Sequence, residues 1–145
     1  MRVLQRRPLP GVLVAVGAAL LASACGPAED PAVAEGRELY EVNCQICHGE
    51  TGVGDGPMAA SLPVPPVSLI EHVGHHSSSE MYRLITGGIP PAMPPHILSE
   101  QQVAVIVDFL WTLVPDDQVA ALREMQRQIE EMSRAAEGVD TTPEP

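Results

Sequence analysis

Two cysteines and a histidine stand close together in the segment Cys44-Gln45-Ile46-Cys47-His48. Two thiols one helical turn apart can form thioether bonds to the two vinyl groups of a porphyrin. A histidine that follows them directly then faces the iron from the same side, and neutral imidazole is a good iron ligand. The C-x-x-C-H spacing therefore predicts the covalent attachment of one haem, with His48 as an axial ligand.

Two other kinds of site also use a C-x-x-C pair. A zinc site would need two further ligands. Four downstream histidines are candidates for them: His72, His75, His76 and His96. A thioredoxin-like redox pair would lie between a strand and a helix, whereas the residues before Cys44 have a helical pattern. The haem interpretation is favoured because the five-residue pattern is specific, and the other two remain alternatives.

The stretch around the motif is similar to a known family. Residues 36–49 match the pattern G-x-x-L-[YF]-x-x-x-C-x-x-C-H-G, which opens the class I cytochromes c. The resemblance covers residues 34–115 and continues in four short segments: Gly52–Pro57, Pro65-Pro66, Gly87-Gly88 and Ala92–Pro94. It implies an all-α fold, with roughly three to five helices around one covalent haem c, and single-electron transfer as the function.

Class I cytochromes place a methionine thioether on the iron opposite the histidine, and the resemblance assigns that role to Met93. Four prolines surround Met93 within residues 87–95. Proline restricts the chain, so a stiff loop can hold a weak ligand in place. A histidine in this position is the alternative and would lower the reduction potential; the candidates are His72, His75, His76 and His96. The other internal methionines are interpreted as core residues: Met58, Met81, Met125 and Met132.

The resemblance also assigns a supporting role to Pro57. In the family, a proline carbonyl after the haem motif accepts the ring N–H of the axial histidine. That bond fixes the tautomer and raises the basicity of the ligand. Pro57 follows His48 in a glycine-rich loop, so we expect its carbonyl to accept this hydrogen bond. A plain turn proline is the alternative.

The first 24 residues have the pattern of an export signal. Three arginines lie within the first seven residues, and an apolar stretch, too short to span a membrane, ends in small residues. Residues 21–25, Leu-Ala-Ser-Ala-Cys, resemble the lipobox of bacterial lipoproteins, which implies that Cys25 is lipidated. We expect an exported protein on the periplasmic or cell-surface side, anchored to a bacterial membrane through Cys25. Ordinary secretion, with Cys25 as a spare thiol, is the alternative.

The remaining chain divides by pattern. We expect a tether at 25–33, a cytochrome c domain at 34–115, an amphipathic helix at 116–138 and a disordered tail at 139–145. The amphipathic helix carries an apolar stripe with coiled-coil spacing, and we expect it to pack on its own domain. The stripe consists of Leu122, Met125, Ile129, Met132 and Ala136.

Within the cytochrome domain, helices are predicted from about Ala32 to Asn43, from Ser78 to Thr86 and from Glu100 to Val114. A short helical turn is expected near residues 58–62. Three polar residues are placed to cap these helices: Asp30, Ser77 and Ser99. In the class I cytochromes that the sequence resembles, the last of these helices crosses the first near its aromatic residues, which implies that Tyr40 and Phe109 meet there.

The charge of the chain limits its partners. Lysine is absent and the net charge is −11; without the three arginines of the signal, five basic residues face nineteen acidic ones, a net charge of −14. Such a surface repels nucleic acid and is expected to steer basic protein partners. The alternative is that the acidity serves only to keep the protein soluble. With both axial positions filled, we expect no small-molecule substrate and no catalysis. The function is then electron transfer between redox proteins, alone or as a subunit of a larger oxidoreductase. The alternative is a haem-based gas or peroxide sensor, or a small enzyme, with a labile sixth ligand.

Overall fold

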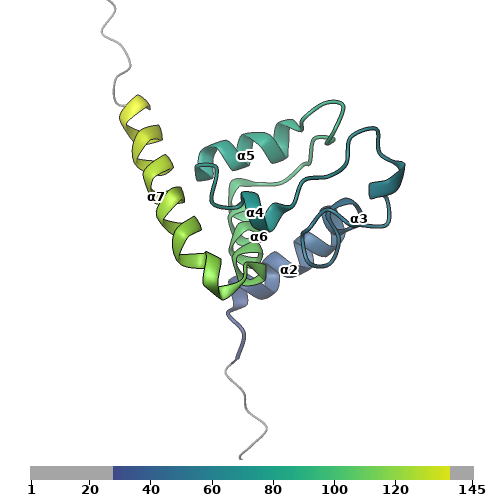
Figure 1. The fold of residues 1–145 in the computed structure, drawn as a ribbon, viewed down its shortest axis with the longest axis horizontal. Coiled ribbons are helices and arrows are strands. Elements are labelled where there is room, and N and C mark those ends of the chain that lie inside the picture. The colour runs from purple at the N-terminus through teal and green to yellow at the C-terminus, as the bar shows by residue number, and fades with distance from the viewer. Residues whose placement is uncertain (1–27, 138–145) are drawn as a thin grey trace, which may run out of the picture.

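The computed structural model describes residues 28–137, and within this range the secondary structure is helical, with no strand (Figure 1). The elements in order are α2 (Pro31–Asn43), α3 (Gln45–His48), η1 (Ala59–Ser61), α4 (Leu69–His72), α5 (Ser78–Gly87), α6 (Glu100–Leu113) and α7 (Asp116–Glu137). The prediction of an all-α fold is confirmed. The expected signal at 1–24, the expected lipidation site Cys25 and the expected tail at 139–145 lie outside the described residues.

The caps that the sequence predicts begin the helices where expected. The Asp30 carboxylate accepts a hydrogen bond of 2.9 Å from the Ala32 N–H, and Ser77 Oγ accepts one of 3.2 Å from the Glu80 N–H. Ser99 exchanges two hydrogen bonds with Gln102 in a complete capping box. Because α2 begins at Pro31, the last three residues of the expected tether at 25–33 belong to the helix instead.

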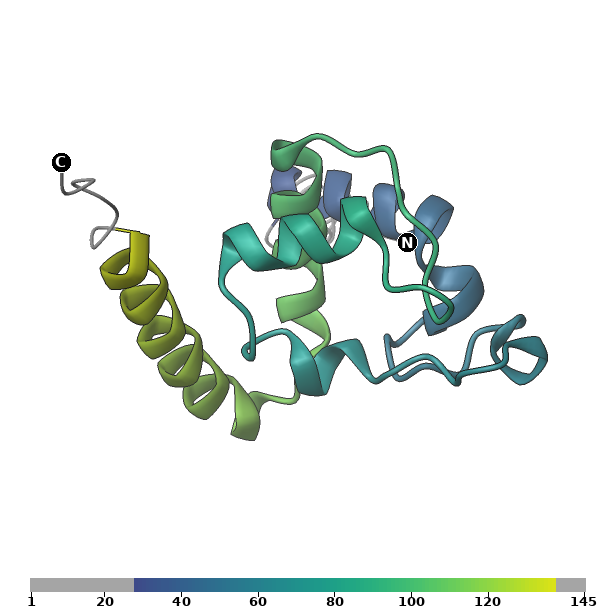
Figure 2. The same ribbon diagram turned by 90° about the horizontal axis from the view of Figure 1, so that it is seen from above.

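The core lies where α2 crosses α6. The rings of Tyr40 and Phe109 meet there, with centroids 5.3 Å apart and planes at 52°, as the sequence predicts. Gly36 permits the close approach, because a Cβ at this position would lie 1.9 Å from the Val105 carbonyl oxygen. Figure 2 shows the crossing from above, with α5 beside α6. Eight buried side chains form this core: Tyr40, Val73, Ile106, Phe109, Leu110, Trp111, Val114 and Leu122.

Residues 49–67 form an irregular loop, as the glycine and proline content predicts. Its one helical piece, η1, falls inside the turn expected at 58–62. The four-residue helix α4 was not predicted from the sequence. It follows this loop and packs against α6, so the chain rejoins the helical core after the irregular loop.

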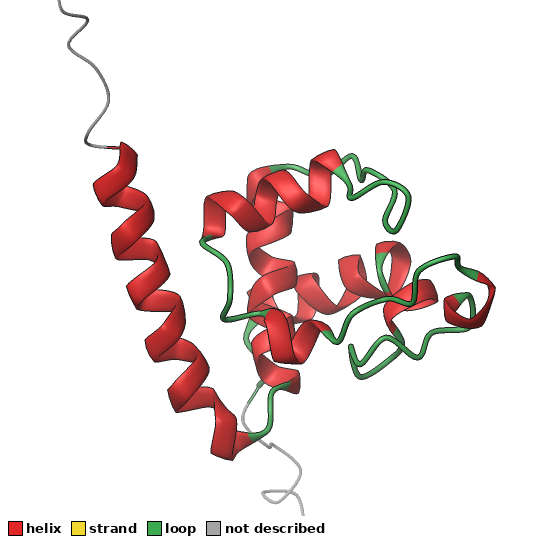
Figure 3. Ribbon diagram, turned by 45° about the horizontal axis from the view of Figure 1, so that its top comes forward, coloured by secondary structure: helices red, strands yellow, loops and turns green. Residues whose placement is uncertain are grey.

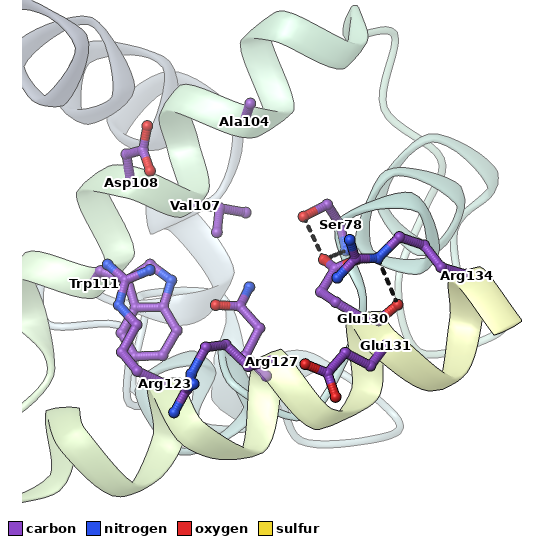
Figure 4. Close-up of a pocket in the computed structure, with 11 residues that line it drawn as sticks. Ser78, Ala104, Val107, Asp108, Trp111, Arg123, Arg127, Glu130, Glu131 and Arg134 are labelled. Carbon is purple, nitrogen blue, oxygen red and sulfur yellow. Dashed lines mark hydrogen bonds between the residues drawn. The ribbon is translucent and has the colours of Figure 1, made fainter.

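Helix α7 extends away from the other helices, as Figures 1 and 3 both show. It is joined to them at three points. Leu122 is buried against Gly74. The Arg123 guanidinium lies 3.8 Å from the centre of the Trp111 ring, and Glu130 accepts hydrogen bonds of 2.7 Å from the N–H and the hydroxyl of Ser78 (Figure 4). Packing within the chain is therefore confirmed.

The face of α7 that packs differs from the predicted apolar stripe. Leu122 is buried and Ile129 is half-buried, but Met125, Met132 and Ala136 are exposed. The helix therefore turns a different face to the domain than its apolar stripe predicts, because the polar contacts of Arg123 and Glu130 help to fix its position. None of the helices among residues 28–137 combines the length and hydropathy that crossing a membrane requires.

Candidate haem-binding site

The chain turns at Cys44, between α2 and α3, and this turn gathers the three motif residues. The Cys44 carbonyl accepts hydrogen bonds from the N–H of Cys47 at 3.1 Å and from the N–H of His48 at 2.9 Å. All three side chains therefore project from a single helical turn, as their spacing predicts. Both cysteines are free thiols of intermediate burial, so both are available for bonding to a porphyrin.

The imidazole of His48 is buried and fixed at one nitrogen. Only 9% of the residue is exposed, and Nδ1 lies 3.2 Å from the Val67 carbonyl oxygen. With Nδ1 as the donor, Nε2 carries the lone pair and can bind a metal. Burial lowers the pKa of His48; the hydrogen bond to Val67 opposes this shift, and the charge of His96 adds to it. The imidazole is thus neutral near pH 7, the form that binds iron.

The acceptor of this hydrogen bond corrects the prediction for Pro57. Gly56 donates its N–H to the Cys47 carbonyl, and Met58 donates to the Ile46 carbonyl. These two bonds hold the exposed Pro57 along the backbone of α3. The hydrogen bond expected for the Pro57 carbonyl is made by the Val67 carbonyl instead. The chain comes back to the His48 ring only at the end of the loop.

Two glycines hold this part of the loop in place. Gly52 accepts a hydrogen bond of 2.6 Å from the Leu69 N–H. Gly54 has a φ of +90°, and a Cβ on it would lie 2.4 Å from the Pro66 carbonyl oxygen and 3.3 Å from that of Val67. A side chain at Gly54 would therefore push residues 66 and 67 away from His48. The glycine-rich run was visible in the sequence. The role of Val67 was missed because every residue has a backbone carbonyl, so the sequence does not indicate which one accepts the hydrogen bond.

The alternatives for the C-x-x-C pair lose support from the geometry. Burial and the neighbouring Cys47 raise the pKa of Cys44 from 9.0 to about 11, whereas a reactive redox pair needs a lowered thiol pKa. Among residues 28–137, no three His, Cys, Asp or Glu side chains form a group that could hold a metal ion. The zinc alternative, which needs four ligands in one place, therefore lacks its further ligands.

Met93 lies in the loop between α5 and α6, which extends towards α3 in Figures 2 and 3. Ile89 and Met93 exchange two backbone hydrogen bonds, each of 2.8 Å. These bonds close a narrow turn, and Met93 is half-buried within the loop. His96 lies three residues further on, and its N–H donates to the Ile85 carbonyl at 3.1 Å. The loop thus brings both the predicted ligand and its alternative to the side of the molecule that His48 occupies.

The other three histidines lie around α4 and the start of α5. Nδ1 of His72 lies 2.9 Å from the Ser68 carbonyl, and the rings of His72 and His75 are 5.3 Å apart. His75 is exposed, and His76 lies 3.2 Å from the carboxylate of Glu80. Their contacts are with neighbours on these elements, and this favours polar side chains over ligands to the candidate site.

The residues present fit a covalent haem. Two free thiols and one neutral, oriented imidazole form the donor set that the cofactor needs. The two loops that flank α3 also carry apolar side chains that protein covers only in part, as suits an apolar macrocycle. Six of these are at least 42% exposed: Val53, Met58, Val64, Val67, Ile89 and Ile97.

A separate cleft of about 410 Å³ lies between α6 and α7 (Figure 4). Its floor includes Val107 and Trp111, and its walls carry charges of both signs, among them Arg123, Arg127 and Glu131. None of the residues predicted to bind haem lines it. The cleft is therefore a consequence of how α7 leaves the domain, apart from the candidate site.

Comparison with known proteins agrees with this geometry. The model of the family described as "Cytochrome C oxidase, cbb3-type, subunit III" matches residues 31–110, the span from the start of α2 through most of α6. No curated protein and no solved structure matches the chain significantly. Since the matched span is more than half of the chain and contains the C-x-x-C-H turn, the protein belongs to this family of c-type cytochromes, which bind haem c covalently and take part in electron transfer.

Proposed function

We propose that this protein is an exported, mono-haem c-type cytochrome that carries single electrons between redox proteins. Its iron is held by His48 and Met93, and lipidated Cys25 tethers it to the membrane. The observation that carries the proposal is the turn that projects Cys44, Cys47 and His48 together, with Nδ1 of His48 engaged by Val67. When bound, the haem supplies one-electron redox chemistry at its iron.

Each residue of the site has a defined task in this proposal. Cys44 and Cys47 hold the porphyrin through thioethers, and His48 presents Nε2 to the iron. The Val67 carbonyl keeps the Nδ1 proton in place and makes the imidazole a stronger donor. Met93 would supply the second iron ligand, from a loop that its hydrogen bonds with Ile89 keep narrow. With both ligands supplied by the chain, small molecules would be excluded from the iron and electrons would pass through the outer sphere.

The partners of such a carrier follow from its charge and its tether. The mature chain has no lysine and a large excess of acidic residues, which attracts redox partners with basic docking surfaces. A lipid anchor raises the local concentration of the protein near membrane complexes. The family description names an oxidase subunit, and this supports a place beside or within a larger membrane oxidoreductase.

Visible spectroscopy tests the haem and its ligands. Protein made with haem-attachment machinery should show sharp c-type bands on reduction, one haem per chain and a far-red thioether-to-ferric-iron band. Met93→Ala should remove that band, and carbon monoxide should bind the ferrous form of the variant but not of the parent. Met132→Ala is the control, because Met132 is exposed on α7.

The other outcomes point elsewhere. A spectrum that survives Met93→Ala but changes in His96→Ala would assign the sixth position to His96. Carbon monoxide binding by the parent protein would favour the sensor or enzyme alternative, and a colourless protein would reject the cytochrome altogether. For the tether, Cys25→Ser should move the protein from the membrane fraction to the soluble fraction.

A further inference from the structure

The outer face of α2 combines acidic and apolar side chains. Glu35, Glu38 and Glu41 are all exposed. Val42 and Ile46, one turn further on, are 81% and 54% exposed, an unusual degree for aliphatic residues on well-formed helical backbone. Residues three and four apart share one side of a helix, so Glu35, Glu38 and Val42 form one line on α2, and Glu41 lies next to Val42. Ile46 belongs to α3, just past the turn at Cys44. We call these five residues the α2 face.

No basic side chain on α2 offsets this charge. Arg37 is the only basic residue of the helix, and its guanidinium lies 5.3 Å from the centre of the Phe109 ring, towards α6. Arg37 also forms an ion pair with Glu29. The α2 face therefore keeps the full negative charge of its three carboxylates, next to an apolar centre.

The position of the α2 face suits electron transfer. Its apolar end, Val42 and Ile46, brackets Cys44 in the sequence, and Ile46 lies between the two cysteines that hold the haem in the proposed function. A protein seated on this end would stand next to the edge of the porphyrin at which the thioethers form. Close approach is what electron transfer requires, whereas a partner bound on α7 would be separated from the site by α6 (Figure 1).

We infer that the α2 face is the docking site for a redox protein whose contact surface has a basic rim around an apolar centre. The inference rests on the proposed electron-carrier function. The three carboxylates steer the partner to this side and set the association rate, while Val42 and Ile46 provide dry contact. With only two aliphatic side chains at its centre, the contact is of the small, transient class used by redox partners.

Stopped-flow kinetics on the haem-loaded protein tests this. The probe is a basic blue copper protein, whose absorption is distinct from that of the haem, used as the electron acceptor. The triple variant Glu35→Gln/Glu38→Gln/Glu41→Gln should lower the second-order rate constant about tenfold at low ionic strength and flatten its dependence on salt. Val42→Ser/Ile46→Ser should lower the rate constant but leave the salt dependence unchanged.

A matched control separates docking from net charge. Glu124→Gln/Glu131→Gln/Glu137→Gln removes three exposed carboxylates from α7 and should change the rate constant less than twofold. Equal losses in both triple variants would mean that net charge alone acts, and an unchanged rate in the α2 variants would place docking elsewhere; either result overturns the inference.

The reduction potential and spectrum of each variant are measured first, so that driving force and haem content are known. A parent protein without haem would instead reject the proposed function, which keeps the two failures distinct. Loss of rate in the serine variant with an unchanged spectrum supports the apolar centre, and no loss in that variant overturns the inference.

Discussion

The ring of His48 is held between its own helix and a backbone carbonyl 19 residues further along the chain. This carbonyl, that of Val67, acts on the imidazole through Nδ1 and makes Nε2 more basic. In the proposed function, where His48 binds the iron, a more basic imidazole stabilises ferric iron over ferrous iron and so lowers the reduction potential. Gly54 is part of this arrangement, because only a residue without Cβ leaves room for the backbone at Pro66 and Val67.

Replacing Gly54 with alanine should therefore raise the reduction potential. The new Cβ meets the Pro66 carbonyl, and φ at this position is +90°, so the loop must move and the bond from His48 to Val67 weakens. Loss of about 1 kcal/mol of preferential ferric stabilisation corresponds to a rise of about 40 mV. The strained backbone should also lower the free energy of unfolding by about 1–3 kcal/mol. Spectroelectrochemical titration and guanidinium unfolding measure the two effects.

Gly87→Ala provides the control for this substitution. A Cβ at Gly87 has nothing within 4 Å, and Gly87 is the last residue of α5. Its potential should match that of the parent protein. A Gly54→Ala variant that is less stable but has an unchanged potential would show that the Val67 carbonyl has no influence on the iron.

At the scale of single residues, the sequence predicts the side chains that carry chemistry but not the backbone groups that support them. Cys44, Cys47 and His48 are identifiable because their types and spacing are specific, and the structure places them on one turn. Val67 was missed because any residue supplies a carbonyl. Pro57 was predicted because the family uses a proline carbonyl after the haem motif, yet its neighbours Gly56 and Met58 are hydrogen-bonded to the backbone of α3.

At the scale of elements, helix starts were predictable from their caps. Asp30, Ser77 and Ser99 accept the N-terminal hydrogen bonds that their positions imply. Helix α4 was not predictable, because four residues carry no periodicity and its position depends on packing against α6. The orientation of α7 could not be predicted from the sequence pattern either. Its apolar stripe indicated which face would pack on the domain, but the polar contacts of Arg123 and Glu130 place a different face there.

The contact between α5 and α7 yields a prediction. Glu130 accepts two hydrogen bonds from Ser78, the first residue of α5, and places negative charge at the positive end of that helix. Glu130→Ala should lower the free energy of unfolding by about 1 kcal/mol and speed amide exchange along α7. Hydrogen exchange and thermal unfolding report both effects. Glu131→Ala is the control, since Glu131 is exposed; equal losses in the two variants would mean that the Ser78 contact does not hold α7.

At the scale of the whole molecule, Tyr40 connects the helical core to the site. Its ring packs on Phe109, and its hydroxyl donates a hydrogen bond of 2.6 Å to the Gly49 carbonyl, directly after His48. Burial, followed by the charges of Cys44 and Asp55, raises the pKa of Tyr40 well above its ordinary value of 10.0. The folded protein therefore keeps this proton at pH values where the unfolded chain has lost it.

This shift predicts an alkaline limit to stability. A raised native pKa contributes stability that is complete below pH 10 and is lost as the pH rises through the alkaline range. Tyr40→Phe should lower the free energy of unfolding by about 1–2 kcal/mol at neutral pH, because the hydrogen bond to Gly49 is lost. Between about pH 8 and about pH 11, however, the free energy of unfolding should fall less in this variant than in the parent protein. Guanidinium unfolding at both pH values measures this. Tyr82→Phe, on α5, should keep the parental alkaline loss; parallel profiles for Tyr40→Phe and the parent would contradict the assignment.

The paired hydrogen bonds between Ile89 and Met93 also bear on the speed of electron transfer. An electron that arrives or leaves changes the charge on the metal, and any ligand that must then move adds to the reorganisation energy of the step. Residues 89–93 are closed by two backbone hydrogen bonds and surrounded by prolines, so Met93, in its proposed role as iron ligand, would be held in nearly the same place in both oxidation states. A loop of this kind favours a small inner-sphere barrier, since its geometry is set by folding before the electron moves.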